Sequence, residues 1–287
     1  MKKIALLLTL LFSIATLAAC ANTVAPSAPA TAPNTPAAAE PANRLEQILA
    51  DGKITMVTSP DYAPFTFMNP NLSGQEAIVG ADIELGKFIA AELGVELVIE
   101  PMDFAATLAA VQMGRADMNI GGLTWKEERV GQMMLTKPYN TGSYQGIMIP
   151  LAMADTLKTA EDFDDLLVGA QNASLQLQNV ETQLPNARVQ LVSTIPDGIM
   201  LLRTGRIDAL AIGGTVGEQF VRNYSDLAMS EFHFELGDSL GTVLAIPNGS
   251  QELFDRIEEI IDIVVERGLY TEWLGEAEIL ADTLALN

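Results

Sequence analysis

The sequence predicts an α/β protein built from two lobes. Short apolar stretches alternate with amphipathic stretches of helical spacing, first over 54–142 and again over 143–239. Each series contains a strand that ends at a pair of glycines, Gly121-Gly122 in the first and Gly213-Gly214 in the second. The chain has 287 residues, 49% of them hydrophobic, which is enough for two moderate cores. Such alternation predicts parallel sheets that are covered by helices on both faces.

In the first series, the spacing of apolar residues and the residues that stop each stretch predict the helices and strands. The expected elements are a helix over 44–50, a strand over 54–58, a helix over 82–93, a strand over 95–99, a helix over 105–113 and a short strand before Gly121. In the second of these helices, Leu85, Ile89 and Leu93 recur at helical spacing, and Gly94 follows as a stop.

The second series repeats this order. The expected elements are strands over 145–150, 167–170, 188–192 and 207–212, with helices over 174–184 and up to 204. A last helix over 251–266 has Ser250 as its N-cap and Gly268 as its stop. The segment 242–247 resembles 146–150, and we expect it to return beside that strand, so that two crossover strands form a hinge.

Composition excludes one class of partner. The chain carries 16 Lys and Arg against 37 Asp and Glu, a formal net charge of −21. A basic surface for a phosphate backbone cannot easily dominate such a field, so we expect no nucleic-acid partner. The acidity is interpreted as a solubility feature of a protein outside the cytoplasm.

The N-terminus predicts export. Lys2 and Lys3 precede an apolar stretch over 4–17 that is too short to span a bilayer, so residues 1–19 are predicted to be a signal peptide. The sequence Leu17-Ala-Ala-Cys20 resembles a bacterial lipobox, which implies cleavage before Cys20 and lipid attachment to its thiol. The alternative is a chance cysteine beside an ordinary cleavage site. Since Cys20 is the only cysteine, no internal disulfide is possible.

The domain organisation follows from these signals. Residues 20–43 are rich in Pro and Ala and are predicted to be an extended linker. Lobe 1 is expected over 44–142, lobe 2 over 143–239, and a second part of lobe 1 over 240–287.

The first glycine pair indicates an anion site. Glycines leave backbone N–H groups uncovered by side chains, and the Thr124 hydroxyl and the Arg129 guanidinium follow within a few residues. This combination suits a carboxylate. The alternative for Arg129 is a surface ion pair with Glu127 or Glu128.

Several short motifs stand in the order found in one protein family. They are Tyr62-Ala-Pro-Phe65, Val79-Gly-Ala-Asp82, Gly114-Arg-Ala-Asp117, Gly121-Gly-Leu-Thr124, Glu128-Arg129, Lys137-Pro-Tyr139, Val168-Gly-Ala-Gln171, Gly205-Arg-Ile-Asp208 and Gly268-Leu-Tyr270. From Lys53 to Trp273 the chain resembles polar amino-acid-binding proteins of ABC importers, extracellular solute-binding protein family 3. The resemblance implies a two-lobe periplasmic-binding-protein fold that traps a small ligand and delivers it to a membrane permease.

The resemblance also implies a ligand site. The positions concerned are Tyr62, Phe104, Gly122, Thr124, Arg129 and Ser174. Arg129 would hold the ligand carboxylate, Thr124 would supply a hydroxyl, Gly122 a backbone contact, and Ser174 its hydroxyl and N–H. Tyr62 and Phe104 would be aromatic walls, and for Phe104 plain core packing is the alternative.

Two positions depart from the family pattern. Lys126 replaces a frequent threonine, and Gly213 stands where the family usually has the Asp that holds the ligand's ammonium group. Either another acid such as Glu218 or Asp238 substitutes, or the ligand is not a standard α-amino acid. A small carboxylate, most simply an amino acid or an analogue, is the expected ligand.

We expect a binding protein without cofactor, metal site or catalytic residue, held outside the cytoplasm by a lipid anchor on the bacterial membrane. His233 lies between two phenylalanines, which indicates a strand or surface role rather than catalysis. The alternatives are a ligand-binding sensor subunit and a dehydratase-like enzyme on the same fold, since a fold does not determine function.

Overall fold

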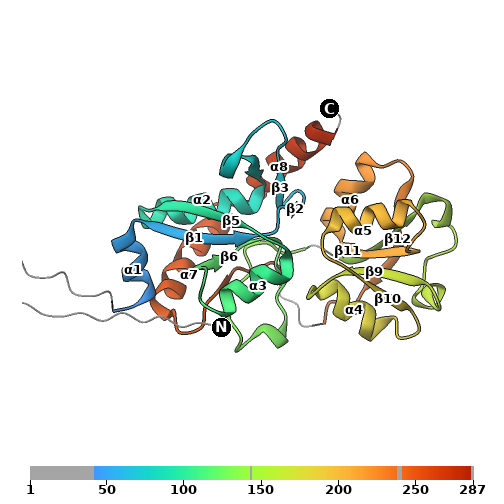
Figure 1. Cartoon of the computed structure of the whole chain (residues 1–287), viewed down its shortest axis with the longest axis horizontal. Helices are drawn as coiled ribbons and strands as arrows, with labels where there is room; N and C mark the ends of the chain where they lie inside the picture. Colours follow the sequence, from blue (N-terminus) through green and yellow to red (C-terminus); the bar gives the residue numbers. More distant parts are fainter. Residues whose placement is uncertain (1–41, 143, 238–240, 286–287) are drawn as a thin grey trace, which may run out of the picture. The chain divides into compact units, whose positions relative to one another are not determined.

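The computed structural model describes residues 42–142, 144–237 and 241–285 of the protein. These residues belong to one compact unit that covers 41–287. They form two five-stranded sheets and one small sheet, which Figure 1 separates into a blue-green half and a yellow-orange half. The predicted signal peptide, Cys20 and nearly all of the predicted linker lie outside the described residues.

The first sheet has the strand order β5-β1-β6-β13-β7. Its strands are β1 (Lys53–Thr58), β5 (Glu96–Pro101), β6 (Met118–Asn119), β7 (Met134–Leu135) and β13 (Ala245–Ile246). A small sheet lies beside it, with β2 (Asp61–Tyr62), β3 (Thr66–Met68) and β4 (Ile78–Val79) in that order. The helices of this lobe are α1 (Arg44–Asp51), α2 (Ala81–Leu93), α3 (Phe104–Gln112), α7 (Gln251–Glu266) and α8 (Leu269–Ala285).

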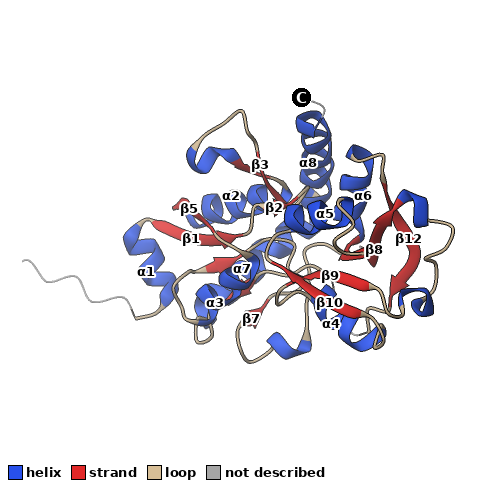
Figure 2. Ribbon diagram, turned by 45° about the vertical axis from the view of Figure 1, so that its right-hand side comes forward, coloured by secondary structure: helices blue, strands red, loops and turns tan. Residues whose placement is uncertain are grey.

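The second sheet has the order β10-β9-β11-β8-β12. Its strands are β8 (Gln145–Pro150), β9 (Leu167–Gln171), β10 (Arg188–Val192), β11 (Ala209–Gly213) and β12 (Leu227–Phe234). Its helices are α4 (Leu175–Gln183), α5 (Ile195–Arg203) and α6 (Gly214–Asn223). Figure 2 shows helices beside both sheets, as expected for an α/β protein.

Local sequence explains where these elements begin and end. Helix α2 ends at Gly94, which adopts a left-handed φ of 71°, and α7 has the predicted bounds. The apolar face of α7 is buried through Leu253, Ile257 and Val264, whose spacing is that of an amphipathic helix. Ser250 occupies the N-cap position but its side chain makes no capping hydrogen bond. Strand β11 lies in the middle of its sheet, and all five of its residues are buried.

Two expectations about strands are wrong. The sheets are mixed rather than parallel, because β13 runs antiparallel to β6 and β7, and β8 runs antiparallel to β11 and β12. The segment 242–247 does not return beside 146–150, because β8 already has a partner on each side and leaves no free edge. A strand that enters from the other lobe reaches the sheet from the opposite end, which explains the antiparallel direction.

The chain passes between the two sheets twice, and the two crossings lie side by side. Asn140 and Thr242 form an antiparallel bridge, and the Thr242 N–H donates to the Asn140 carbonyl at 2.8 Å. These two residues mark a hinge of two extended segments between the lobes.

The C-terminal helix α8, which was not predicted, connects both lobes. It contacts α2 and α7 on one side and α6 on the other. Asp282 accepts a hydrogen bond from Gln219 at 2.5 Å and lies 3.3 Å from Arg222, both on α6. At the start of α8, Tyr270 is buried and the Trp273 ring lies 5.7 Å from the Phe88 ring between centroids, so both rings pack against the first lobe.

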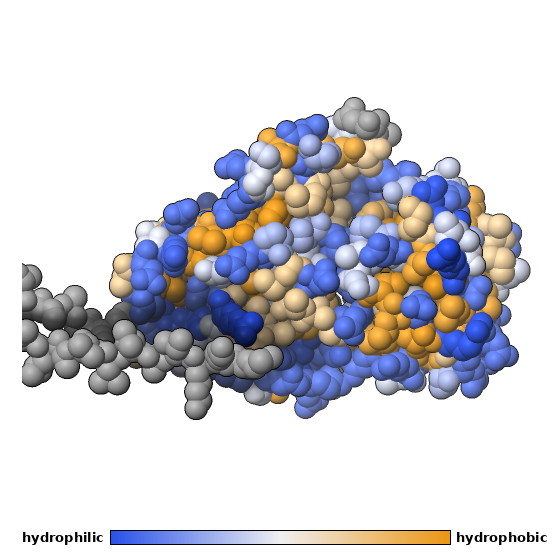
Figure 3. Space-filling model, viewed as in Figure 1, coloured by the Kyte–Doolittle hydropathy of each residue, from blue (hydrophilic) through white to orange (hydrophobic). Residues whose placement is uncertain are grey.

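Among the helices of the described residues, none combines the length and the apolar character needed to cross a bilayer. Figure 3 shows apolar side chains gathered on the second lobe, where the edge strand β10 leaves Val189 and Leu191 exposed.

Candidate functional site

Two adjoining cavities lie between the two sheets. The smaller has a volume of about 20 Å³ and the larger about 340 Å³. Tyr62, Gly122 and Thr124 line both, so the two cavities share these three residues as a common wall. All six residues predicted to bind ligand line the smaller one. The structure therefore brings together side chains from β2, from α3, from the Gly-Gly exit of the first sheet and from the start of α4.

Arg129 is the buried cation of this site. It ends a short 3₁₀ turn over Glu127–Arg129 and is only 6% exposed. Its Nη1 donates to the Thr124 carbonyl at 2.5 Å and its Nη2 to the Ala173 carbonyl at 3.0 Å, one acceptor in each lobe. Burial lowers the pKa of Arg129 to about 10, and the nearby Glu128 opposes that shift.

No carboxylate of the described residues forms an ion pair with Arg129. All ion pairs among the described residues involve residues other than Arg129. The alternative of a surface ion pair between Arg129 and Glu127 or Glu128 is therefore wrong. Glu128 instead accepts a short hydrogen bond from Gln178 of the other lobe. A buried guanidinium that has only carbonyl partners retains donors for a planar anion.

The second lobe meets Arg129 at the start of α4. Ala173 has a left-handed φ of 62°, which costs a non-glycine residue about 1 kcal/mol or more and turns its carbonyl toward the guanidinium. Ser174 is buried and caps α4, since its Oγ accepts from the Leu177 N–H at 3.0 Å. The Ser174 N–H donates to the Gln171 carbonyl, so its hydroxyl proton is the group left to donate into the cavity.

The Gly122 amide has a partner within its own lobe. Its N–H donates to Asp82 Oδ2 at 2.6 Å, and the Tyr139 and Tyr270 hydroxyls donate to Asp82 Oδ1 at 3.1 and 2.6 Å. Asp82 is fully buried, and burial raises its pKa to about 6 against the effect of these three donors. The expectation of an uncovered amide at Gly122 is therefore wrong, because the protein supplies its own carboxylate there.

Tyr62 spans the space between the lobes. A Cβ on Gly122 would lie 2.7 Å from the Tyr62 ring, and a Cβ on Gly213 would lie 2.5 Å from its hydroxyl oxygen. The Gly213 N–H donates to that oxygen, and Gln176 Nε2 lies 3.4 Å from it. Burial raises the pKa of Tyr62 well above its usual value. The ring also stacks on Phe65 at 5.8 Å between centroids.

Phe104 combines both roles that the sequence left open. It packs against the apolar cluster under the first sheet and also lines the smaller cavity. The Arg129 guanidinium carbon lies 5.8 Å from its ring centroid, within the range of a cation–π contact.

Asp61 is a site residue that the sequence analysis missed. It precedes Tyr62 on β2, and its carboxylate accepts from the Ile195 N–H at 2.9 Å and from Gln171 Nε2 at 3.2 Å, both in the second lobe. Ser59 also donates to it at 2.6 Å. Burial raises the pKa of Asp61, and these donors oppose the shift. Asp61 is thus a direct contact between the lobes at the start of α5, where a negative charge is favourable.

Lys126 and the two acids considered as substitutes for the missing aspartate at Gly213 lie away from the two cavities or outside the described residues. Lys126 lines a third cavity with Glu127 and Glu128 rather than the two cavities beside Tyr62, and burial lowers its pKa. Glu218 accepts a hydrogen bond from the Tyr144 hydroxyl at 2.8 Å and lines neither cavity. Asp238 lies outside the described residues.

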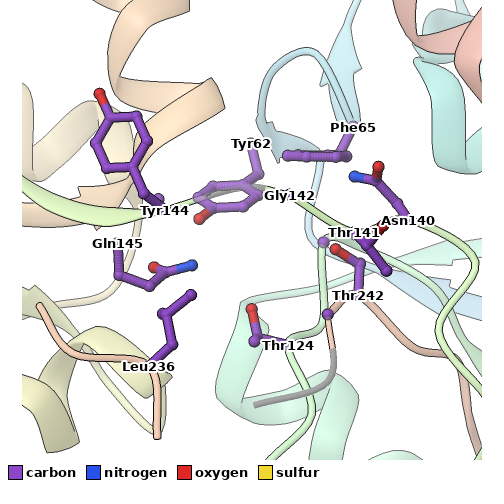
Figure 4. Close-up of a pocket in the computed structure, with 13 residues that line it drawn as sticks. Tyr62, Phe65, Thr124, Asn140, Thr141, Gly142, Tyr144, Gln145, Leu236 and Thr242 are labelled. Carbon is purple, nitrogen blue, oxygen red and sulfur yellow. The ribbon is translucent and has the colours of Figure 1, made fainter. Parts of the chain in front are cut away.

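The larger cavity is lined in part by residues that belong to none of the sequence motifs. Figure 4 shows Tyr62 between Phe65 on one side and Gln145 and Tyr144 on the other, with Thr124 below. Asn140 and Gln145 come from the first crossing between the lobes, where only their position after the Lys137-Pro-Tyr139 motif could have suggested a role.

Within the described residues no cluster of His, Cys, Asp and Glu has a metal-binding arrangement. His233 is exposed on β12 and its ring stacks on Tyr144 at 4.1 Å, which agrees with the predicted strand or surface position.

Comparison with known proteins gives a consistent result. Residues 54–276 match the model of bacterial extracellular solute-binding proteins, family 3. The chain is 26% identical over 218 residues to the arginine-binding extracellular protein ArtP of Bacillus subtilis, covering 75% of this chain and 82% of ArtP. It also resembles AbpA of Streptococcus pneumoniae, an amino acid ABC transporter substrate-binding protein solved with L-arginine. That likeness has a TM-score of 0.78 and 32% identity, and covers 82% of this chain and 98% of AbpA.

One relative is an enzyme. A shorter stretch of 97 residues is 27% identical to the cyclohexadienyl dehydratase of Pseudomonas aeruginosa, covering 34% of this chain and 35% of the dehydratase.

Proposed function

Because the chain belongs to the bacterial extracellular solute-binding proteins of family 3, we propose that it captures an amino acid between its two lobes and delivers it to the permease of an ABC importer. The ligand carboxylate is held by Arg129, with Thr124, Ser174 and Gly122 around it and with Tyr62 and Phe104 as walls.

The observation that carries this proposal is the environment of Arg129. The guanidinium is buried, lines a cavity between the lobes and has carbonyl oxygens as its hydrogen-bond acceptors. An unpaired buried cation is costly, whereas a bidentate carboxylate would match both its charge and its planar geometry. A ligand that replaces carbonyl partners by a carboxylate would therefore gain affinity at this position.

Contacts between the lobes would link ligand binding to closure of the two lobes. Asp61, Tyr62 and Arg129 each extend from the first lobe to a partner in the second. A ligand that adds contacts to both lobes shifts the population toward the closed form, which is the form that a permease would recognise.

A thermal-shift screen tests this function. The purified protein is heated with each of the standard amino acids and with simple carboxylates that lack an amine. We expect at least one amino acid to raise the melting temperature, because a ligand at a hundred times its Kd adds about 2.7 kcal/mol of stability. The proposal fails if no carboxylate produces a shift.

We further propose that the mature chain is a lipoprotein anchored through Cys20 outside the cytoplasm, as the segment 17–20 implies. Cells given a labelled fatty acid should incorporate the label into the protein and not into the Cys20→Ser variant. Equal labelling of the two would contradict the anchor.

We infer that the chain does not catalyse a reaction, since the dehydratase matches only about a third of it whereas binding proteins match most of it. Incubating the protein with prephenate or arogenate, acids that undergo this kind of dehydration, should give no turnover, and release of the aromatic product would contradict the inference. A sensor subunit would use the same ligand site; genes for a permease and an ATPase beside this one would favour import.

A further inference from the structure

The larger cavity is uncharged, which is unusual for this chain. The protein has 37 acidic and 16 basic residues, yet none of the described residues that line the 340 Å³ cavity is acidic or basic. Its polar groups are the hydroxyls of threonine and tyrosine side chains and the amides of Asn140 and Gln145. Its size is at the small end of ligand pockets, which span about 300–1,000 Å³.

Gln145 is oriented by the protein. It is 4% exposed, and its Oε1 accepts a hydrogen bond from Gln176 Nε2 at 2.5 Å. With the carbonyl end of the amide held in this way, the NH₂ end faces the cavity, as Figure 4 shows, and makes no hydrogen bond to a described residue. A buried amide donor that points into a cavity offers a hydrogen bond to an acceptor oxygen of the ligand, such as a carbonyl oxygen.

The charges of the adjoining cavity are balanced. Arg129 and Asp61 are its lining residues with a charge, one of each sign, among those that the structure describes. An amino acid with a neutral side chain also carries one charge of each sign. An additional charge on the side chain would enter the larger cavity without a partner among the described residues, which costs several kcal/mol in a buried site.

We propose that the ligand is an amino acid whose side chain is an uncharged amide, glutamine or asparagine, with the side-chain carbonyl accepting from Gln145 in the larger cavity. This inference rests on the proposed function, because it assumes that Arg129 holds the carboxylate at the other end. The proposed ligand differs from the arginine that the names or structures of two relatives specify.

Calorimetric titration of the purified protein with glutamine, asparagine, arginine and glutamate tests the proposal. We expect glutamine or asparagine to bind at least tenfold more tightly than arginine or glutamate. The Gln145→Glu variant replaces the donor by an anion, so it should lose at least tenfold in amide-ligand affinity and change the preference toward arginine. Gln190→Glu, the same change at an exposed residue of β10, should leave the affinities unaltered.

The outcomes separate the two proposals. Tighter binding of arginine or glutamate than of glutamine and asparagine would overturn the inference while leaving the proposed function intact. Arginine binding that is lost in the Asp238→Asn variant would also overturn it, since an acid outside the described residues would then supply the missing charge. If no amino acid binds, the proposed function fails and the inference fails with it.

Discussion

The two glycine pairs contact the same residue, Tyr62, in different ways. Gly122 lies under the Tyr62 ring, and its N–H is fixed by the buried carboxylate of Asp82. Gly213 lies against the Tyr62 hydroxyl, and its N–H donates to that hydroxyl instead of to an acid. The first pair therefore makes its contacts within its own lobe, whereas the second makes its contact across the lobes.

This difference explains the departure at Gly213. A side chain at position 213 would occupy the space of the Tyr62 hydroxyl, so an aspartate there and this position of Tyr62 exclude each other. The ring of Tyr144 covers the next residue, Gly214, in the same way. The two strand ends resemble each other in sequence, but among the described residues only the first has a carboxylate as its partner, Asp82, which is bonded to other groups of the protein.

Of the two glycine pairs, the first should show the larger effect, through its Asp82 network. The folded-state pKa of about 6 is raised above the ordinary value of 3.8, so the native state binds the proton more tightly than the unfolded state. The resulting stability is present at low pH and is lost as pH rises through 6, by about 2 kcal/mol between pH 4 and pH 7.

Urea unfolding of the wild type and of Asp82→Asn from pH 4 to pH 7 measures this effect. The free energy of unfolding of the wild type should fall relative to that of the variant as pH rises, because the variant has no carboxyl group to titrate. Parallel pH profiles of the two proteins would show that the pKa of Asp82 is not raised in the folded protein.

Gly213→Asp tests the second pair and should have a smaller effect. The new Cβ would lie 2.5 Å from the Tyr62 hydroxyl oxygen, so the ring must move and its contact with the second lobe is lost. We expect the affinity for the ligand found in the screen to fall about tenfold, or about 1.4 kcal/mol. Adding Tyr62→Phe should restore part of the loss, because the conflicting hydroxyl is gone.

The control for this substitution is Gly275→Asp, where a Cβ meets nothing within 4 Å. It should bind like the wild type. An increase in affinity of Gly213→Asp would mean that the aspartate contacts the ligand ammonium and that Tyr62 moves without cost.

Local patterns predicted the elements and the side chains that carry distinct chemistry. The bounds of α7 follow from its apolar spacing, whereas the six site positions were implied by the family resemblance, and all six line one cavity. The antiparallel direction of β13 and the existence of α8 depend on how the chain returns between lobes, which periodicity does not encode.

The residues that sequence analysis missed act over long distances in the chain. Asp61 bonds to Ile195, and Gln145 is oriented by Gln176, so neither role is visible from neighbouring residues. Asp82 was noticed only as part of a motif, since its partners Gly122 and Tyr270 come from distant segments. Such contacts between distant segments decide whether a polar residue faces the ligand or another part of the protein.

The most direct test of the central claim is calorimetric titration of Arg129→Ala with the ligand identified by the screen. The account predicts that binding is lost by a factor of 100 or more, about 3 kcal/mol, while circular dichroism shows a folded protein. Arg206→Ala, an exposed arginine before β11, should bind like the wild type. Retained affinity in a folded Arg129→Ala protein would contradict the claim that this guanidinium holds the ligand carboxylate.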